Sequence, residues 1–366
     1  MIVRGEDSTV TDAALQGNTD SGTGVNISGD LTNAGSTTVN GVSSGSGAGV
    51  NISGKLTNTG STTVNGVSSG SGTGVDLSGN VSGGTVNGSS VSGSGVIVSG
   101  TVNSTVNGQS ESGNGVQLSG NAEVTGTGQV SGGSVSGNGV NVSGDVTNKG
   151  SVKGESSSGN GAVISGSLTG NDSATITGST TGNGSGLHLS GTVTGGSLSG
   201  SSVGGDAVHL GDGAQVSGAN VSGTSQSGAG IKTDGSVHLK GVHLTGASDT
   251  GADLDVSGTL SHDPATVITA PDVTGREHIK VVEQGHPGTM TAATSQRQGA
   301  VNAQVSGMNM AAQGGFHSAG MPAVPVSGYQ PAERTVDISL CEGSDCQSES
   351  LDAGKPAEGR AKASGR

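Results

Sequence analysis

An internal repeat is the feature that most constrains what this chain can fold into. Residues 26–50 read NISGDLTNAGSTTVNGVSSGSGAGV and residues 51–75 read NISGKLTNTGSTTVNGVSSGSGTGV, which are identical at 22 of 25 positions. A looser form, S-G-x-G-Φ-x-Φ-S-G with Φ an aliphatic residue, recurs much further along the chain. Because self-similarity at a near-constant period marks repeat architectures, the chain is expected to fold by stacking similar units.

The looser repeat contains eleven copies of an alternating tripeptide, spaced 20 to 25 residues apart. Its third position is aliphatic in ten copies, with Thr233 as the exception, and its middle position is polar in nine. This alternation is typical of a short strand with one buried face. Flanking glycines are expected to supply the positive φ angles of tight corners. The first positions, which we call the anchors, are Val25, Val50, Val75, Val96, Val116, Val140, Ala162, Leu187, Val208, Ile231 and Leu254.

A unit of about 23 residues with two or three short strands cannot bury its own apolar face, so neighbouring units must stack. The sequence therefore predicts an all-β fold, a right-handed parallel β-helix of about eleven coils over residues 1–260. The Asn-Gly pairs at 40–41, 65–66, 87–88 and 107–108 are expected to end further short strands. The alternative is a disordered Gly/Ser/Thr-rich linker. Alternation sustained over eleven cycles favours the β-helix.

Composition excludes several classes of protein. Of 366 residues 74 are Gly, and hydrophobic residues make up only 29%, which is too little bulky apolar volume for a conventional single-core enzyme. The net charge of −14 argues against a nucleic-acid partner. No apolar run is long enough to span a membrane, and the N-terminus lacks the apolar core of a signal peptide. We expect either an intracellular protein or a piece of a longer exported chain.

The character of the sequence changes near residue 261. All seven prolines and both aromatic residues lie beyond it, and proline ends regular strand pairing because it cannot donate a backbone hydrogen bond. We expect a Pro-containing cap and connection over residues 261–334, with a capping strand within 275–284. Residues 335–366 are expected to form a C-terminal anchor segment that carries the two cysteines and a mobile tail.

Cys341 and Cys346 are the only cysteines and are separated by four residues. Such a pair forms either a small disulfide loop or two inert thiols, and the extracellular character of the repeats favours the disulfide. A loop this short would contribute little to global stability. A zinc site would need two further ligands nearby, and none is evident.

Candidate catalytic and metal-binding residues are few. His188 and His209 occupy the same outward position in neighbouring units, so their rings are expected about 5 Å apart. They would form either a weak two-ligand metal site or a solvated surface ladder, and the ladder is favoured, as it is for His238 and His243. The Asp residues do not recur at a fixed position and the calcium-binding nonapeptide is absent. The sequence therefore predicts no catalytic, cofactor or metal site.

Asn-x-Ser/Thr sequons are a further sequence feature. Three of the nine, at Asn26, Asn51 and Asn141, fall at the outward position between the two aliphatic residues. A sugar could be attached there. The abundance of Asn, Ser and Thr in this chain accounts for most of these matches.

The repeat from Val25 to Gly258, the Pro-bearing change after it and the terminal Cys pair together resemble the C-terminal part of large two-partner-secreted exoproteins. These are the filamentous haemagglutinin and high-molecular-weight adhesin type. The resemblance implies that Cys341 and Cys346 form a disulfide knob that holds the chain end in an outer-membrane transporter. It also implies a secreted or cell-surface location as part of a longer precursor, with glycosylation of Asn sequons in some members.

The resemblance predicts a non-enzymatic stalk and anchor of a bacterial adhesin, with a host-cell or surface receptor that the sequence does not identify. The chain departs from the family pattern because no signal peptide or N-terminal secretion domain is recognisable, which favours a truncated fragment. The alternatives are an autotransporter passenger, a polysaccharide-acting β-helix enzyme and a disordered linker. The aromatic-rich β-barrel of an autotransporter is missing, and an enzyme would need clustered acids on one face.

Overall fold

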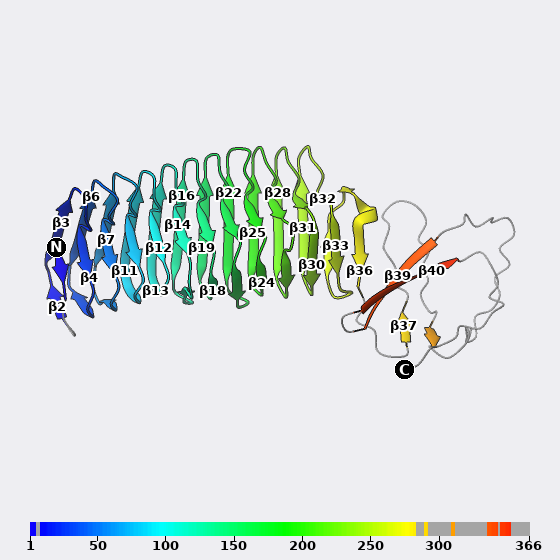
Figure 1. Cartoon of the computed structure of the whole chain (residues 1–366), viewed down its shortest axis with the longest axis horizontal. Coiled ribbons are helices and arrows are strands. Elements are labelled where there is room, and N and C mark those ends of the chain that lie inside the picture. The colour runs from blue at the N-terminus through cyan, green and yellow to red at the C-terminus, as the bar shows by residue number, and fades with distance from the viewer. Residues whose placement is uncertain (5–7, 283–288, 292–308, 312–334, 343–344, 353–366) are drawn as a thin grey trace. The chain divides into compact units, whose positions relative to one another are not determined.

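The computed structural model describes residues 1–4, 8–282, 289–291, 309–311, 335–342 and 345–352. The chain divides into two units, residues 1–261 with 265–279, and residues 262–264 with 280–366. The first unit is a parallel β-solenoid, in which each turn of the chain contributes one strand to each of three ladders (Figure 1). The predicted all-β solenoid is therefore confirmed.

The first ladder is a 13-stranded parallel sheet, here called sheet A. Its strands, in spatial order, are β1 (Ile2–Val3), β4 (Val25–Ile27), β7 (Val50–Ile52), β10 (Val75–Leu77), β12 (Val96–Val98), β14 (Val116–Leu118), β17 (Val140–Val142), β20 (Ala162–Ile164), β23 (Leu187–Leu189), β26 (Val208–Leu210), β29 (Ile231–Thr233), β32 (Leu254–Val256) and β35 (Val273–Thr274).

The second and third ladders share two long strands, β11 (Val81–Ser90) and β13 (Thr101–Ser110), which run through both. The second ladder otherwise includes β2 (Ser8–Thr11), β5 (Leu31–Ala34), β8 (Leu56–Asn58), β15 (Glu123–Val124), β18 (Asp145–Asn148), β21 (Ser167–Gly170), β24 (Thr192–Thr194), β27 (Gln215–Ser217), β30 (Ser236–Lys240) and β33 (Thr259–His262). The third comprises β3 (Ala14–Thr19), β6 (Thr38–Ser43), β9 (Thr63–Ser68), β16 (Gln129–Ser134), β19 (Ser151–Ser156), β22 (Thr175–Thr180), β25 (Ser197–Ser202), β28 (Asn220–Ser225), β31 (His243–Ser248) and β34 (Val267–Thr269).

Sheet A confirms the register expected from the repeat. The first ten anchors are each paired with the anchor of the next coil, from Val25 with Val50 to Ile231 with Leu254. All eleven are fully buried. Sheet A also contains β1 and β35, two strands beyond the eleven predicted. The repeat did not predict them because neither carries the S-G-x-G-Φ motif.

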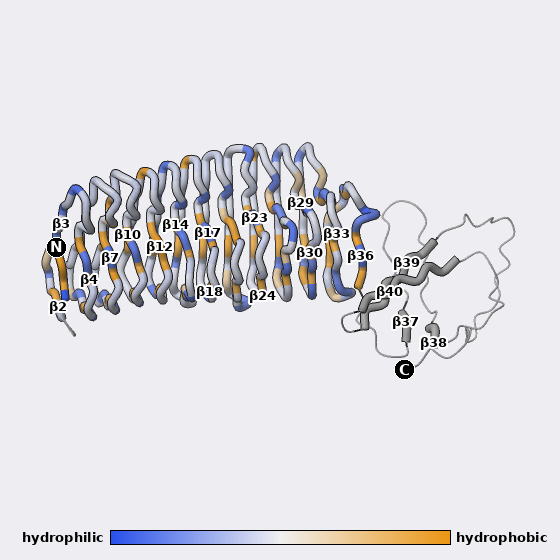
Figure 2. The backbone as a smooth tube through the Cα atoms, viewed as in Figure 1, coloured by the Kyte–Doolittle hydropathy of each residue, from blue (hydrophilic) through white to orange (hydrophobic). Residues whose placement is uncertain are grey.

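Aliphatic side chains fill the interior of the solenoid. The inward Val, Ile and Leu of the three ladders form one continuous cluster from Val25 to Leu260, which appears as repeated orange segments along the strands in Figure 2. Burial of a Val or Leu side chain stabilises a fold by about 1.5–3 kcal/mol. The scarcity of aromatic residues fits this narrow interior.

The glycines that precede the anchors have a different role from the one expected. Gly49 and Gly74 do not have positive φ angles. Instead, a methyl group on Gly41 of β6 would overlap the carbonyl oxygen of Gly49, and one on Gly66 of β9 would overlap that of Gly74. These glycines let the third ladder approach sheet A closely. Positive φ angles occur at other corners, such as Gly83 and Gly84.

The Asn-Gly pairs also differ from expectation, because they lie inside strands and do not end them. Asn40, Asn65, Asn87 and Asn107 stack in register in β6, β9, β11 and β13. Each side-chain amide donates to the side-chain oxygen of the preceding Asn, at 2.9, 3.0 and 3.0 Å. The hydrogen-bonded ladder and the inward glycine outweigh the usual turn preference of this dipeptide.

Beyond β35 the structure contains a short 3-10 helix (Arg276–His278) and β36 (Ile279–Val281), a strand within the stretch 275–284 where one was expected. The second unit contains two antiparallel pairs, β37 (Thr289–Thr291) with β38 (Asn309–Ala311) and β39 (Thr335–Glu342) with β40 (Asp345–Asp352). The predicted mobility of the tail lies largely outside the described residues. In the described part of the chain, no helix is long and apolar enough to cross a membrane.

Candidate functional site

The two histidines singled out in the sequence lie next to each other on the outer face of sheet A. His188 of β23 pairs in register with His209 of β26. Their ring centroids are 4.7 Å apart and the rings are nearly perpendicular, at 79°. The predicted proximity of these side chains is confirmed, and polar side chains of the next two coils join them to form a cluster.

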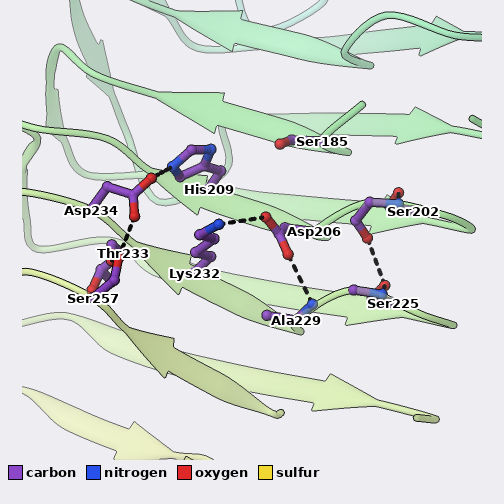
Figure 3. Close-up of polar contacts among 12 residues, drawn as sticks. Ser185, Ser202, Asp206, His209, Ser225, Ala229, Lys232, Thr233, Asp234 and Ser257 are labelled. Carbon is purple, nitrogen blue, oxygen red and sulfur yellow. Dashed lines mark hydrogen bonds and ion pairs between the residues drawn. The ribbon is translucent and has the colours of Figure 1, made fainter. Parts of the chain in front are cut away.

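His209 is held by a carboxylate from the next coil. Its Nε2 lies 2.7 Å from Oδ2 of Asp234, which follows β29. The other carboxylate oxygen of Asp234 accepts a hydrogen bond from the hydroxyl of Ser257, one coil further on (Figure 3). The chain of contacts Ser257–Asp234–His209–His188 therefore crosses four successive coils.

A second charged pair lies beside the first. Nζ of Lys232 is 3.9 Å from Oδ2 of Asp206, and the other oxygen of Asp206 accepts the backbone N–H of Ala229 at 2.9 Å (Figure 3). Lys232 continues the outward column of sheet A, directly after His209. The cluster thus contains two acids, one lysine and two imidazoles.

Burial and neighbouring side chains shift the pKa of two groups in this cluster, His188 and Asp234. Burial, together with the neighbouring His209, lowers the pKa of His188 below 6.5, and Asp234 partly opposes this shift. The hydrogen bond from Ser257 is the main cause that lowers the pKa of Asp234 below 3.8. Elsewhere in the same column, burial raises the pKa of Asp76. Burial disfavours the charged form of each group, and a hydrogen bond to a carboxylate favours it.

The described residues of the cluster show neither a metal-binding group of three or more ligands nor a serine that is hydrogen-bonded to a histidine. Among the residues that the structure describes, no group of three or more His, Cys, Asp or Glu side chains is placed to hold a metal ion. Ser257 is bonded to Asp234 and not to the imidazole that would activate a nucleophile. A small hollow at an inner corner, lined by Asn148, Leu168 and Ile176 among others, has no titratable side chain.

Several of the scattered aspartates, to which the sequence assigned no role, hydrogen-bond one coil to the next. A carboxylate oxygen of Asp12, Asp30 and Asp212 accepts a backbone N–H of the following coil, at Ser36 (2.8 Å), Lys55 (3.0 Å) and Ser236 (2.7 Å). Asp206 does the same. Each aspartate and the backbone N–H that it accepts are about one coil apart in the sequence. A local pattern around the aspartate therefore does not reveal the contact.

A second feature that sequence reasoning missed is a buried row of hydroxyl groups at the end of the third ladder. Ser134, for example, donates to the carbonyl of Gly113 at 2.7 Å and accepts the N–H of Gly137 at 2.9 Å. The row is formed by eight hydroxyl groups in successive coils, those of Ser90, Ser110, Ser134, Ser156, Thr180, Ser202, Ser225 and Ser248.

Two serines at the same position do not join the row. The hydroxyl groups of Ser43 and Ser68 are buried without a hydrogen-bond partner among the described residues. Their corners have six residues before the next anchor, against five after Ser134. The additional residue alone does not prevent the contact, because Thr180 precedes a corner of the same length and still accepts the N–H of Gly182 at 3.3 Å.

The remaining candidate residues lie apart from the cluster. His238 of β30 and His243 of β31 are both exposed and belong to different ladders. Of the outward sequons, Asn51 donates its amide to Asn26 at 2.9 Å. In the second unit, the backbone register of β39 and β40 pairs Cys341 with Cys346. Their side chains lie outside the described part of the structure, so the disulfide stays a prediction.

Comparisons with known proteins identify no relative. No family model, curated protein or solved structure matches this chain.

Proposed function

We propose that this chain is a non-enzymatic stalk and anchor portion of a bacterial surface protein of the adhesin or haemagglutinin type. The proposal rests on the solenoid and on the resemblance of the repeat and the Cys pair to two-partner-secreted exoproteins. In this proposal the coils provide reach, and the C-terminal segment holds the chain end in an outer-membrane transporter. The chain acts mechanically and takes no cofactor.

The observation that carries the proposal is the uninterrupted core. Aliphatic side chains are stacked in register from the first anchor to Leu260, and the backbone of each coil is hydrogen-bonded to its neighbours. At about 4.8 Å per coil, the twelve steps between the strands of sheet A give a rod of about 60 Å. An enzyme would use acidic side chains at a cleft. Here the carboxylates of Asp12 and Asp212 instead accept backbone N–H groups of the following coil.

Antibodies raised against the purified chain would test the location in the cells that produce it. The stalk proposal predicts immunogold labelling of intact cells, at a distance from the outer membrane. Labelling that appears only after the cells are permeabilised would contradict it.

The anchor is tested separately with the double variant Cys341→Ser, Cys346→Ser. If the cysteines retain the chain end, the variant is released into the medium while the wild type stays with the cells. A single variant, Ser339→Ala in the same segment, serves as the control and is expected to stay cell-bound. Equal retention of all three proteins would contradict the anchor role.

A further inference from the structure

The outward column of sheet A contains two side-chain pairs at equivalent register positions and of different chemistry. Near one end, the amide of Asn51 donates to Asn26 at 2.9 Å across adjacent strands β4 and β7. Near the other end, the imidazoles of His188 and His209 contact each other across β23 and β26. An amide pair carries no titratable group, whereas two imidazoles in contact repel each other once both are protonated.

Among the described residues, only one ring of the histidine pair has a carboxylate within hydrogen-bonding distance. A proton on His209 is balanced by Asp234, whose carboxylate lies 2.7 Å from the ring. On the other side of the pair, the column continues with Val163 of β20, which offers no charge. Among the described residues no carboxylate is hydrogen-bonded to His188, and Asp234 acts on it only at longer range.

Among the described residues, none of the other charged groups of the packed coils is hydrogen-bonded or ion-paired to either ring. Lys232 of β29 and Asp206 contact each other at 3.9 Å, and Asp212, in the corner after β26, accepts the N–H of Ser236. Asp255 of β32 lies beyond Lys232 in the column. A second proton on the pair therefore meets a like charge one coil away in a partly buried position, where the repulsion is only weakly screened.

We propose that the His188–His209 pair is an acid-sensitive weak point of the coil stack, at which protonation of both rings opens the ladder between β23 and β26. The direction of the pH effect follows from the linkage between proton binding and opening of the ladder. The pKa of His188 in the folded chain lies below 6.5, so the opened chain takes up the proton first as the pH falls. Acid therefore favours the open form. This device does not depend on the stalk function, since it needs only the stacked coils.

Hydrogen exchange of the full chain, corrected for the intrinsic pH dependence of the amide rate, tests this proposal. Between pH 7.5 and pH 5, peptides that cover residues 187–210 are expected to exchange about tenfold faster, on the order of the effect of one like-charge contact in a partly buried site. Peptides that cover residues 25–52, around Asn26 and Asn51, are the control within the same molecule and should not change.

The matched variant is His188→Asn, His209→Asn, which recreates the amide pair of Asn26 and Asn51. It should keep the same protection at both pH values. The single variant His209→Asn removes the neighbouring imidazole, which is one cause of the lowered pKa of His188, so it should raise that pKa in an NMR titration. Acid-induced exchange in residues 187–210 of the double variant, an equal change in residues 25–52, or an unchanged His188 titration would each overturn the proposal.

Discussion

The α-carbon of Gly108 in β13 faces the carbonyl oxygen of Gly115, which precedes the anchor Val116, at a distance that admits no side chain. The same contact recurs between the third ladder and sheet A in neighbouring coils, for example at Gly132 and Gly139. The width of the solenoid is therefore set by two glycines in contact, together with the aliphatic residues around them.

Substitution of Gly108 by Ala is expected to destabilise the solenoid, because the new methyl group would have to displace the backbone of the adjacent corner. Overpacking of a core typically lowers the free energy of unfolding by about 1–3 kcal/mol. Gly126→Ala is the control, since a methyl group there meets only one atom at ordinary contact distance. Urea unfolding followed by circular dichroism measures both. Equal stability of the two variants would refute the role of the Gly108 contact.

The buried hydroxyl row predicts opposite results for two serines at equivalent positions. Ser134→Ala leaves the carbonyl of Gly113 and the N–H of Gly137 without their partner. We expect it to lower the free energy of unfolding by about 1–3 kcal/mol. Ser68→Ala removes a buried hydroxyl group that has no partner among the described residues, so it should be neutral or stabilising. The same urea unfolding measurement decides, and a larger loss for Ser68→Ala would contradict this assignment.

The lowered pKa of Asp234 predicts that the solenoid loses stability as the pH falls. Its pKa is lowered in the folded chain, chiefly by the hydrogen bond from Ser257. Its ionised form therefore contributes stability above the unfolded pKa of 3.8, and this contribution is lost as the pH falls through the folded value. The difference in unfolding free energy between the wild type and Asp234→Asn should therefore shrink as the pH falls from about 5 into stronger acid.

The control for this prediction is Ser257→Ala, which removes the main cause of the shift. It should move the acid limb of the stability curve to higher pH, toward the value of a free carboxyl group. A difference between wild type and Asp234→Asn that grows as the pH falls below 4 would show that the sign is wrong.

Deletion of residues 51–75 should leave a folded, cooperatively melting protein, because the preceding copy is nearly identical and the coils on either side would meet in register. Deletion of residues 51–63 removes about half a coil and joins strands of different ladders. It should therefore disrupt the stack at that point. Thermal melts by circular dichroism distinguish the two deletions, and equal melting of both would argue against the register described above.

Local patterns in the sequence were enough to predict sheet A. The alternation Val25-Asn26-Ile27 and its recurrence are visible within three residues, so both the buried anchors and the contact of His188 with His209 followed from spacing alone. The repeat period also predicted the solenoid. It did not predict strands β1 and β35, because they lack the motif.

Contacts between coils were not predictable in the same way. Ser134 and Gly113 are 21 residues apart, and serine is so abundant in this chain that its buried positions do not stand out. Asn40-Gly41 was expected to end a strand because the dipeptide is common in turns, but the amide ladder to Asn65 extends β6 through it. In each case the deciding interaction is with the next coil and not with neighbouring residues.

The rod length of the purified chain tests the central claim most directly. Electron microscopy would compare the wild type with a variant that carries four additional copies of residues 51–75. A stack of coils at about 4.8 Å each predicts that the variant is about 19 Å longer, with the same width. Particles of unchanged length, or a coil-like circular dichroism spectrum for either protein, would contradict the solenoid and with it the proposed stalk.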